Sequence, residues 1–266
     1  MNGGPANCNE VTAMQRKNTS EMVRWAKRSL RVAAVVLTSA AHAQISAQAQ
    51  TKPLPGRPRA RTHALVWLQA TDSARSVVYG SDDVLGGLYA YDMNGQMLGK
   101  PVLEQVYGID LKQGIAFNGG TIDLMTVSSA TGLRFFSVGL DGGLSQVQAS
   151  AVTPGTVTAT ALMRSVKGLP MSLWVGYDSG GLTQYTVTEA PAGNQLQATL
   201  VATYAFPGSV TGLVADDATG RLYALGTFGV FYLESTEGAD GGYPDAGVVD
   251  DQLGGAGPLS IFRQKD

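Results

Sequence analysis

Cysteine and histidine are nearly absent from this sequence. It contains one cysteine, Cys8, and two histidines, His42 and His63. A single cysteine excludes an intramolecular disulfide framework, so the folded chain must be held together by its core. So few histidines argue against a multi-histidine zinc site and against a histidine-based catalytic triad.

Long hydrophobic runs and a high density of charge are also missing. Charged residues make up 15% of the chain, hydrophobic residues make up 44%, and glycine contributes 34 of the 266 residues. No apolar run reaches the length that a membrane-spanning helix requires. Short apolar runs bounded by glycine are instead typical of β-rich proteins.

The N-terminal region has the three-part pattern of a secretory signal peptide. Basic residues at positions 24, 27, 28 and 31 precede an apolar stretch at residues 32–37, and Ala41-His42-Ala43 follows as the small-residue motif. We predict a signal peptide at residues 1–43, a polar linker at residues 44–63, and a secreted or periplasmic location. An N-terminal membrane anchor is the alternative, and the short apolar stretch argues against it.

Removal of residues 1–43 would change the charge balance. It takes away six of the 19 lysines and arginines and two of the 21 acidic residues, which leaves a net charge of −6 and no cysteine. A nucleic-acid-binding protein would show a basic patch or stripe. We therefore expect neither a nucleic acid nor a membrane as a partner.

A repeat of β-type sequence begins near Ala64. Each unit has an apolar strand, a turn and a second apolar strand, and the second strands start at Leu88, Phe135, Leu182 and Val230. Successive starts are 47, 47 and 48 residues apart. This period predicts a propeller with one four-stranded sheet per repeat. A β-sandwich with coincidental spacing is the alternative, and three nearly equal intervals argue against it.

The predicted fold class is therefore all-β, a β-propeller of four-stranded blades with about four complete blades plus the start of a fifth. The next repeat would need its second strand near residue 277, beyond Asp266. We expect residues 258–263 to form the inner strand of an incomplete blade, and residues 64–266 to form an incomplete propeller domain. A second propeller domain or another chain is expected to cover the open strand edge.

Asp216 and Asp217 allow two interpretations. They precede Ala218-Thr219-Gly220 between two apolar runs. Aspartate at the start of a turn bonds its own backbone and glycine closes the turn, which favours a tight hairpin. Calcium, which takes several oxygen ligands, is the alternative, although no stretch matches a continuous calcium-binding loop. The acidic, glycine-rich residues 238–257 are interpreted as a solvated insert.

Several stretches resemble the β-propeller phytases. They are GGLYAYDMNGQML at 86–98, VYGIDLK at 106–112, residues 181–223, and ESTEGADGG at 234–242. The resemblance spans about residues 64–263. It implies a secreted, six-bladed phosphatase that hydrolyses phytate, in which carboxylates hold calcium ions and lysine and arginine hold a phosphate group.

Most positions to which the resemblance assigns this chemistry carry other residues. No acid precedes Val66-Trp67. The other expected acids, cations and polar side chains are replaced by Val106-Tyr107-Gly108, Ala130 and Thr131, Ser172, Asp178, Thr211, Leu225-Gly226 and Gly257-Pro258. Turns and apolar strands persist, so the pattern predicts a degenerate active site on a retained fold.

Five candidate site residues remain. By resemblance, Asp110 is the candidate catalytic residue, and Asp216 and Asp217 are candidate metal ligands. Lys112 and Arg134 are the basic residues nearest to the expected phosphate position, and are candidate substrate-binding residues. A solvated strand edge is the alternative for both cations, as a tight turn is for Asp216 and Asp217.

The resemblance implies a phytase-like phosphoric monoester hydrolase of the 3-phytase type. Its cofactor would be calcium, and its substrate would be phytate or another phosphomonoester. The replaced positions predict weak or no activity for the chain alone. The alternative is a non-catalytic exported propeller, a binding or scaffold domain that assists a second phytase domain.

Overall fold

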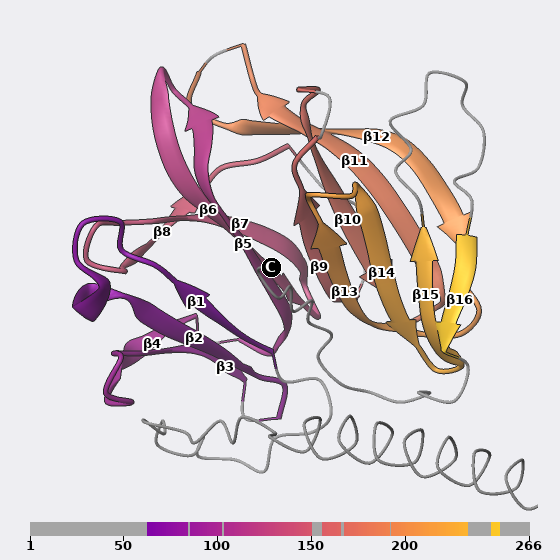
Figure 1. The fold of residues 1–266 in the computed structure, drawn as a ribbon, viewed down its shortest axis with the longest axis horizontal. Helices are drawn as coiled ribbons and strands as arrows, with labels where there is room; N and C mark the ends of the chain where they lie inside the picture. The colour runs from indigo at the N-terminus through magenta and orange to yellow at the C-terminus, as the bar shows by residue number, and fades with distance from the viewer. Residues whose placement is uncertain are drawn as a thin grey trace, which may run out of the picture. The chain divides into compact units, whose positions relative to one another are not determined.

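The computed structural model describes residues 63–84, 86–102, 104–150, 156–165, 168–191 and 193–233, together with the backbone of residues 246–250. Four antiparallel four-stranded sheets follow one another along the chain as the blades of a β-propeller (Figure 1). The predicted propeller of four-stranded blades is therefore confirmed. The strand expected at residues 258–263 lies outside the described residues.

Each blade is a meander of four consecutive strands. Blade 1 consists of β1 (Ala64–Trp67), β2 (Val77–Asp82), β3 (Gly87–Tyr91) and β4 (Met97–Val102). Blade 2 consists of β5 (Val106–Phe117), β6 (Gly120–Ser129), β7 (Gly132–Val138) and β8 (Leu144–Val147). Blade 3 consists of β9 (Val157–Met163), β10 (Met171–Tyr177), β11 (Gly181–Glu189) and β12 (Leu196–Ala205). Blade 4 consists of β13 (Val210–Asp216), β14 (Arg221–Gly226), β15 (Gly229–Leu233) and β16 (Ala246–Asp250).

The described residues contain a single helical segment, the 3₁₀ turn η1 (Ser73–Arg75) between β1 and β2. Within this part of the chain, nothing helical has the length and apolar character needed to cross a bilayer.

The sequence repeat corresponds to the blade repeat. Leu88, Phe135, Leu182 and Val230 lie in the third strands β3, β7, β11 and β15. Turn residues set where each strand of the repeat ends and the next begins. At the β3–β4 hairpin the Asp92 carboxylate accepts from Asn94 N at 2.9 Å, while the backbone of Gly95 has a φ of 78°. Such a φ favours glycine, as a hairpin turn with the dipeptide Asn-Gly requires.

A one-residue bulge recurs near the start of the first strand in blades 2, 3 and 4. The cross-strand register shifts by one residue around Tyr107 in β5, Thr158 in β9 and Thr211 in β13. Bulges bend a strand and redirect side chains. The Thr158 hydroxyl group donates to Gly176 O of its own blade at 3.1 Å and contacts Val210 O of the next blade at 2.5 Å. These bulges therefore help to link successive blades.

The hydrophobic core lies between neighbouring blades. Alternate residues of one strand face opposite neighbours, as the two-residue period of a β-strand requires. In β6, Met125 packs in a cluster with blade 1 residues such as Trp67, whereas the adjacent Leu124 packs with blade 3 residues such as Leu173. Trp174 packs in a third cluster between blades 3 and 4. Blades 2 and 3 are thus each covered on both faces.

One interpretation of the sequence is wrong in part. The acidic stretch at residues 238–257 was interpreted as a solvated insert, but residues 246–250 form β16, which pairs with β15 and completes blade 4. The neighbouring strand supplies the pairing partner, and that tertiary contact outweighs the low β-propensity of the surrounding glycine and aspartate residues.

Candidate functional site

The first strands of blades 2, 3 and 4 run in the same direction, so the propeller has two distinct rims. Near the strand starts, Thr158 in β9 contacts Val210 in β13, and at the other end Lys112 in β5 contacts Asp217 just after β13. We call the rim where these strands begin the proximal rim, and the rim where they end the distal rim.

Three of the five candidate residues converge near the distal rim. Lys112 Nζ donates to Asp217 Oδ2 at 2.8 Å, across 105 residues of sequence. The second oxygen of that carboxylate, Oδ1, accepts from Arg164 N at 3.0 Å. The exposed fractions of the Lys112 and Asp217 side chains are 15% and 32%, so this ion pair is partly shielded from solvent.

Asp110 belongs to the same cluster. It lies two residues before Lys112 in β5, on the same face of the strand. Its Oδ2 accepts from Leu162 N of β9 at 2.6 Å. Burial raises the pKa of Asp110 to about 6, although Lys112 and the backbone N–H groups of Leu162 and Leu111 act in the opposite direction. Asp217 raises the pKa further, so the three charged groups influence one another.

The edge of β9 explains why two carboxylates meet there. As the first strand of its blade, β9 pairs with β10 on one side only, and its other edge carries backbone N–H groups without a strand partner. Leu162 N and Arg164 N lie two residues apart. Leu162 N donates to Asp110 of blade 2, and Arg164 N donates to Asp217 of blade 4. The carboxylates therefore cap a strand edge, and Lys112 balances their charge.

Asp123, Gln113 and Arg164 extend the network to blade 1, and the sequence analysis did not identify them as site residues. The Asp123 carboxylate accepts from Trp67 Nε1 at 2.6 Å and from Gly114 N at 2.7 Å. Gln113 Nε2 donates to Leu68 O at 2.7 Å, and the Arg164 guanidinium group donates to Gln113 O. No local motif marks these residues, because their partners lie on other blades or across a hairpin.

Asp216 takes part in the turn, as one of the two sequence interpretations predicts. Its carboxylate accepts from Ala218 N at 3.1 Å and from the Thr219 hydroxyl group at 2.7 Å. Gly220 N donates to Asp216 O at 2.8 Å, and Gly220 has a φ of 67°. The two adjacent aspartates thus have different surroundings: Asp216 stabilises the hairpin, and Asp217 belongs to the distal cluster.

Arg134 is not brought to this cluster. Its guanidinium group forms an ion pair with Glu104 at 2.9 Å, and the same carboxylate oxygen accepts from the Thr131 hydroxyl group at 3.0 Å. Arg134 pairs with Val127 in β6, which in turn pairs with Ile109 rather than Lys112 in β5. Its predicted role in substrate binding stays a prediction.

The proximal rim carries most of the replaced positions, and the side chains at Thr211 and Leu225 are uncharged. The Thr211 hydroxyl group donates to Leu225 O at 3.2 Å. A Cβ atom built on Gly226 would lie 2.4 Å from Cε1 of Phe206, so this ring fills the space that a side chain at position 226 would need. Burial lowers the pKa of His63, and its hydrogen bond with the Thr211 backbone acts in the opposite direction.

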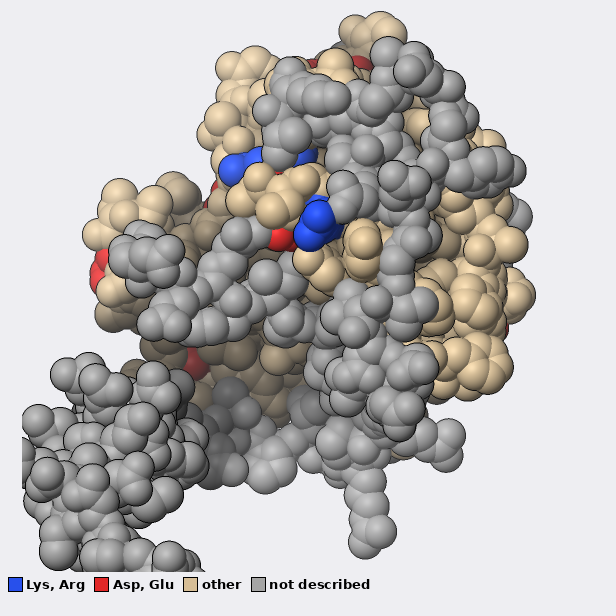
Figure 2. All heavy atoms as spheres, turned by 45° about the vertical axis from the view of Figure 1, so that its right-hand side comes forward, with Lys and Arg blue, Asp and Glu red and all other residues tan. Residues whose placement is uncertain are grey.

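The carboxylates of the described residues are not clustered in a way that indicates a calcium site. Among these residues, no three Asp, Glu, His or Cys side chains are grouped so as to hold a metal ion. Calcium takes six to eight oxygen ligands. Asp110 and Asp217 instead face an ammonium group and backbone N–H groups, which are donors. The described surface visible in Figure 2 is mostly uncharged, with few basic side chains.

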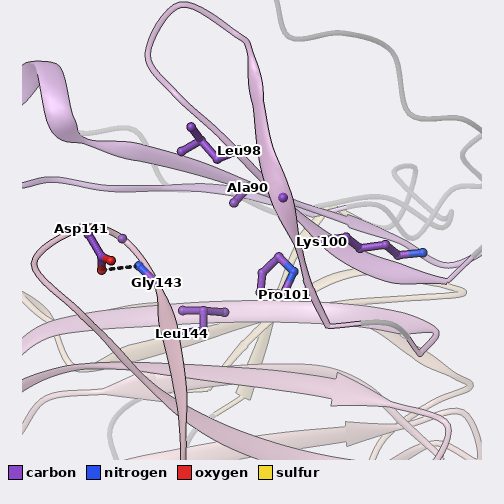
Figure 3. A pocket seen from close by; sticks show the side chains of 9 residues that line it. Ala90, Leu98, Lys100, Pro101, Asp141, Gly143 and Leu144 are labelled. Carbon is purple, nitrogen blue, oxygen red and sulfur yellow. Dashed lines mark hydrogen bonds between the residues drawn. The ribbon is translucent and has the colours of Figure 1, made fainter.

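A hollow of about 300 Å³ lies between blades 1 and 2, away from this cluster (Figure 3). Its walls are largely apolar and include Leu98, Pro101 and Leu144. Asp141 also lines it, but its carboxylate accepts from Gly143 N at 2.9 Å within the β7–β8 turn. None of the five candidate site residues lines the hollow.

Three comparisons with known proteins were made. Residues 14–256 match the model of the Phytase family. No curated protein matches the sequence. Among solved structures, the chain is similar to Sqt1 of Saccharomyces cerevisiae, with 14% identity and a TM-score of 0.45 over 70% of this chain and 48% of that one. The chain therefore spans about half the length of that structure.

Proposed function

Because this chain belongs to the phytase family, we propose that it is a phytase-type propeller whose hydrolysis of phytate is weak or lost when the chain acts alone. The family implies phytate as substrate and calcium as cofactor. The main support for weak or lost activity is the ion pair between Lys112 and Asp217. In it, a candidate substrate-binding cation and a candidate metal ligand bind each other.

Hydrolysis of a phosphate ester needs cationic groups that stabilise the charge of the phosphoryl oxygens. In this chain Lys112 is the candidate cation nearest to Asp110, and its ammonium group already donates to Asp217. To hold a phosphate group it would have to leave Asp217, whose partly shielded carboxylate would lose its partner. Asp110 and Asp217 would also repel the phosphate group. These residues therefore favour blade association over phosphate binding.

Calcium bound by the family would neutralise phosphate and lower the pKa of attacking water. Among the described residues, no three acidic, histidine or cysteine side chains are grouped to hold it. At the proximal rim, where the resemblance places several acids, the chain has Thr211, Leu225 and Gly226 instead. The Thr211 hydroxyl group donates to the carbonyl oxygen of Leu225. We therefore assign no catalytic step to the metal in this chain.

The test is phosphate release from phytate by the chain from Gln44 onwards, measured with calcium and with a chelator. A phytase of established activity serves as the positive control, and far-UV circular dichroism verifies that the sample is folded and β-rich. We expect no calcium-dependent release above background. Release that requires calcium and falls in Asp110→Asn and Asp217→Asn would show that a working site remains.

A second candidate function is that of an exported binding or scaffold domain that assists a second phytase domain. The exposed apolar side chains on two outer strands favour it: Leu98 in β4 and Leu200 and Val201 in β12 are 57%, 57% and 51% exposed. Both strands lie at the outer edge of their sheets, where residues 148–150 pair only with the start of β12 at Leu196. Outer strands are suited to contact with another chain. An increase in phosphate release by an active phytase domain on addition of this chain would support this function, and additive rates would contradict it.

The location is part of the same proposal. The leader pattern at residues 1–43 supports a secreted or periplasmic protein. Fractionation of expressing bacterial cells, followed by N-terminal sequencing, tests it. A mature N-terminus at Gln44 in the periplasm or medium is expected, and an uncleaved chain in the cytosol would contradict the proposal.

A further inference from the structure

We propose that two copies of this chain associate through β12, the outer strand of blade 3. Residues 199–205 of one copy would pair antiparallel with the same residues of the other, about a two-fold axis. β12 lies at the end of its sheet, so one of its edges faces outward (Figure 1). Such association is independent of whether the chain hydrolyses phytate.

β12 differs from the other three outer strands in length and in charge. It has 10 residues, whereas β4, β8 and β16 have 6, 4 and 5. Proteins protect exposed strand edges by keeping them short, or by placing charged residues or proline in them. β4 contains Lys100 and Pro101, and β16 contains Asp250. The sequence of β12, LQATLVATYA, has no charged residue, proline or glycine. It is therefore the outer strand best suited to pair with another strand.

The beginning of this edge already accepts a strand-like segment. Ala149 forms a parallel bridge with Leu196. Ser150 N donates to Leu196 O at 2.9 Å, and Leu196 N donates to Gln148 O at 2.8 Å. Ala198 N then donates to the Ser150 hydroxyl group at 2.9 Å. The outward backbone groups of β12 are thus arranged to pair, and within the described part of the chain no segment continues this pairing beyond Ala198.

The open part of β12 also exposes apolar side chains. Leu200 and Val201 are 57% and 51% exposed. The register with β11 shifts between Leu200 and Ala202, so Val201 is the extra residue of a bulge. A bulge can protect an edge by twisting it, but this one leaves two adjacent apolar side chains in contact with water. Association along this edge would remove them from water.

The occupied beginning of β12 sets where a second copy can pair. Residues 148–150 take the first part of the edge. A two-fold axis at Ala202 would use all of residues 199–205, and would place Val201 opposite Thr203 of the second copy. None of these residues is charged, so two copies of the strand meet without like-charge repulsion. The ladder is short, and we therefore expect a dimer in the micromolar range.

The first experiment measures the mass of the chain from Gln44 onwards by size-exclusion chromatography with light scattering, over a range of micromolar concentrations. We expect a concentration-dependent dimer. Val201→Lys places like charges near the axis and should weaken the dimer at least about tenfold. The matched control is Leu98→Lys on β4, because Leu98 is as exposed as Leu200. It should leave the dimer unchanged. Far-UV circular dichroism verifies that each variant is folded.

Charge reversal distinguishes self-pairing from a general loss of stability. Val201→Glu alone should also weaken the dimer, whereas an equimolar mixture of Val201→Lys and Val201→Glu should form a heterodimer, because opposite charges then meet near the axis. A mixture that is no more dimeric than either variant alone would overturn the proposal. If the variants at position 201 do not fold, Thr203→Lys and Thr203→Glu replace them in the same comparison.

A single cysteine locates the axis, because the chain from Gln44 onwards has no cysteine of its own. Ala202→Cys should form a disulfide-linked dimer on mild oxidation, and Gln197→Cys, beside residues 148–150, should not. A parent chain that is monomeric at every concentration would overturn the proposal. So would a dimer that Leu98→Lys weakens as much as Val201→Lys, or equal cross-linking of the two cysteine variants. Either result would leave the proposal of weak phytate hydrolysis untouched, because the readout is the oligomeric state.

Discussion

The two rims of this propeller differ in what occupies the positions to which the resemblance assigns its chemistry. At the proximal rim the expected acids are replaced by uncharged residues, and a phenyl ring occupies the space beside Gly226. At the distal rim Asp110, Lys112 and Asp217 remain, but Lys112 pairs with Asp217, and both carboxylates accept from backbone N–H groups at or just after β9. The same blade scaffold thus carries uncharged residues at several of these positions on one rim, and on the other rim charged side chains that link blades.

The largest effect is expected from restoring an acid at the proximal rim. In Gly226→Glu, the new Cβ would lie 2.4 Å from Phe206 Cε1 and 3.1 Å from Ser209 O, so the ring and strand would have to move. We predict a loss of about 2–4 kcal/mol in the free energy of unfolding. Urea denaturation measures it. A variant as stable as the parent chain would show that this rim can still accept an acid.

The next effect is expected at the distal rim. Asp217→Ala removes the partner of both Lys112 and Arg164 N, and leaves a largely shielded ammonium group. We predict a loss of about 1–3 kcal/mol. Asp178→Asn is the control at the other rim, where an exposed carboxylate accepts from the Ser209 hydroxyl group, and it should cost less. Equal losses for the two variants would remove the difference between the rims.

The pH dependence of stability should identify Asp110. Its pKa is about 6 in the folded chain against an ordinary value of 3.8, with burial as the main cause. The folded state therefore holds this proton more tightly than the unfolded state. The resulting stability is complete below the ordinary pKa and is lost as the pH rises through about 6.

Asp110→Asn cannot titrate at this position, so it isolates the effect. The unfolding free energy of the parent chain minus that of Asp110→Asn should fall by about 1–3 kcal/mol between about pH 4 and about pH 7. Urea denaturation of both proteins across this range measures the difference. A difference that stays constant or rises with pH would contradict the assigned burial of Asp110.

The smallest effect is expected for the ion pair outside the distal cluster. Arg134 is 39% exposed and pairs with Glu104. We predict that Arg134→Gln costs about 0–1 kcal/mol, because exposed ion pairs contribute little. A loss as large as that of Asp217→Ala would mean that Arg134 belongs to a stabilising network of its own.

The repeat and its turns could be predicted from the sequence because they depend on local chemistry. Alternation and the spacing of Leu88, Phe135, Leu182 and Val230 locate the third strands. The turn at Asp216 follows from side-chain bonds that span only a few residues. β16 was missed because its pairing with β15 is a tertiary contact within a stretch rich in glycine and aspartate.

The candidate site could be predicted only in part. That Asp110 and Lys112 share a face follows from the two-residue period of β5. Their meeting with Asp217 depends on how three blades pack, and no sequence pattern fixes that distance. Asp123 and Arg164 have partners that local periodicity does not reveal, including Trp67 on another blade. By resemblance Asp217 is a candidate metal ligand, whereas in the fold it forms an ion pair with Lys112.

The most direct test of the central claim is a calorimetric titration of calcium into the folded chain from Gln44 onwards. The account holds that Thr211, Leu225 and Gly226 at one rim and the Lys112–Asp217 ion pair at the other leave no strong site for the cation. It predicts no saturable heat of binding. Saturable binding that is weakened by Asp110→Asn or Asp217→Asn would contradict it, and would mean that these carboxylates still serve the metal.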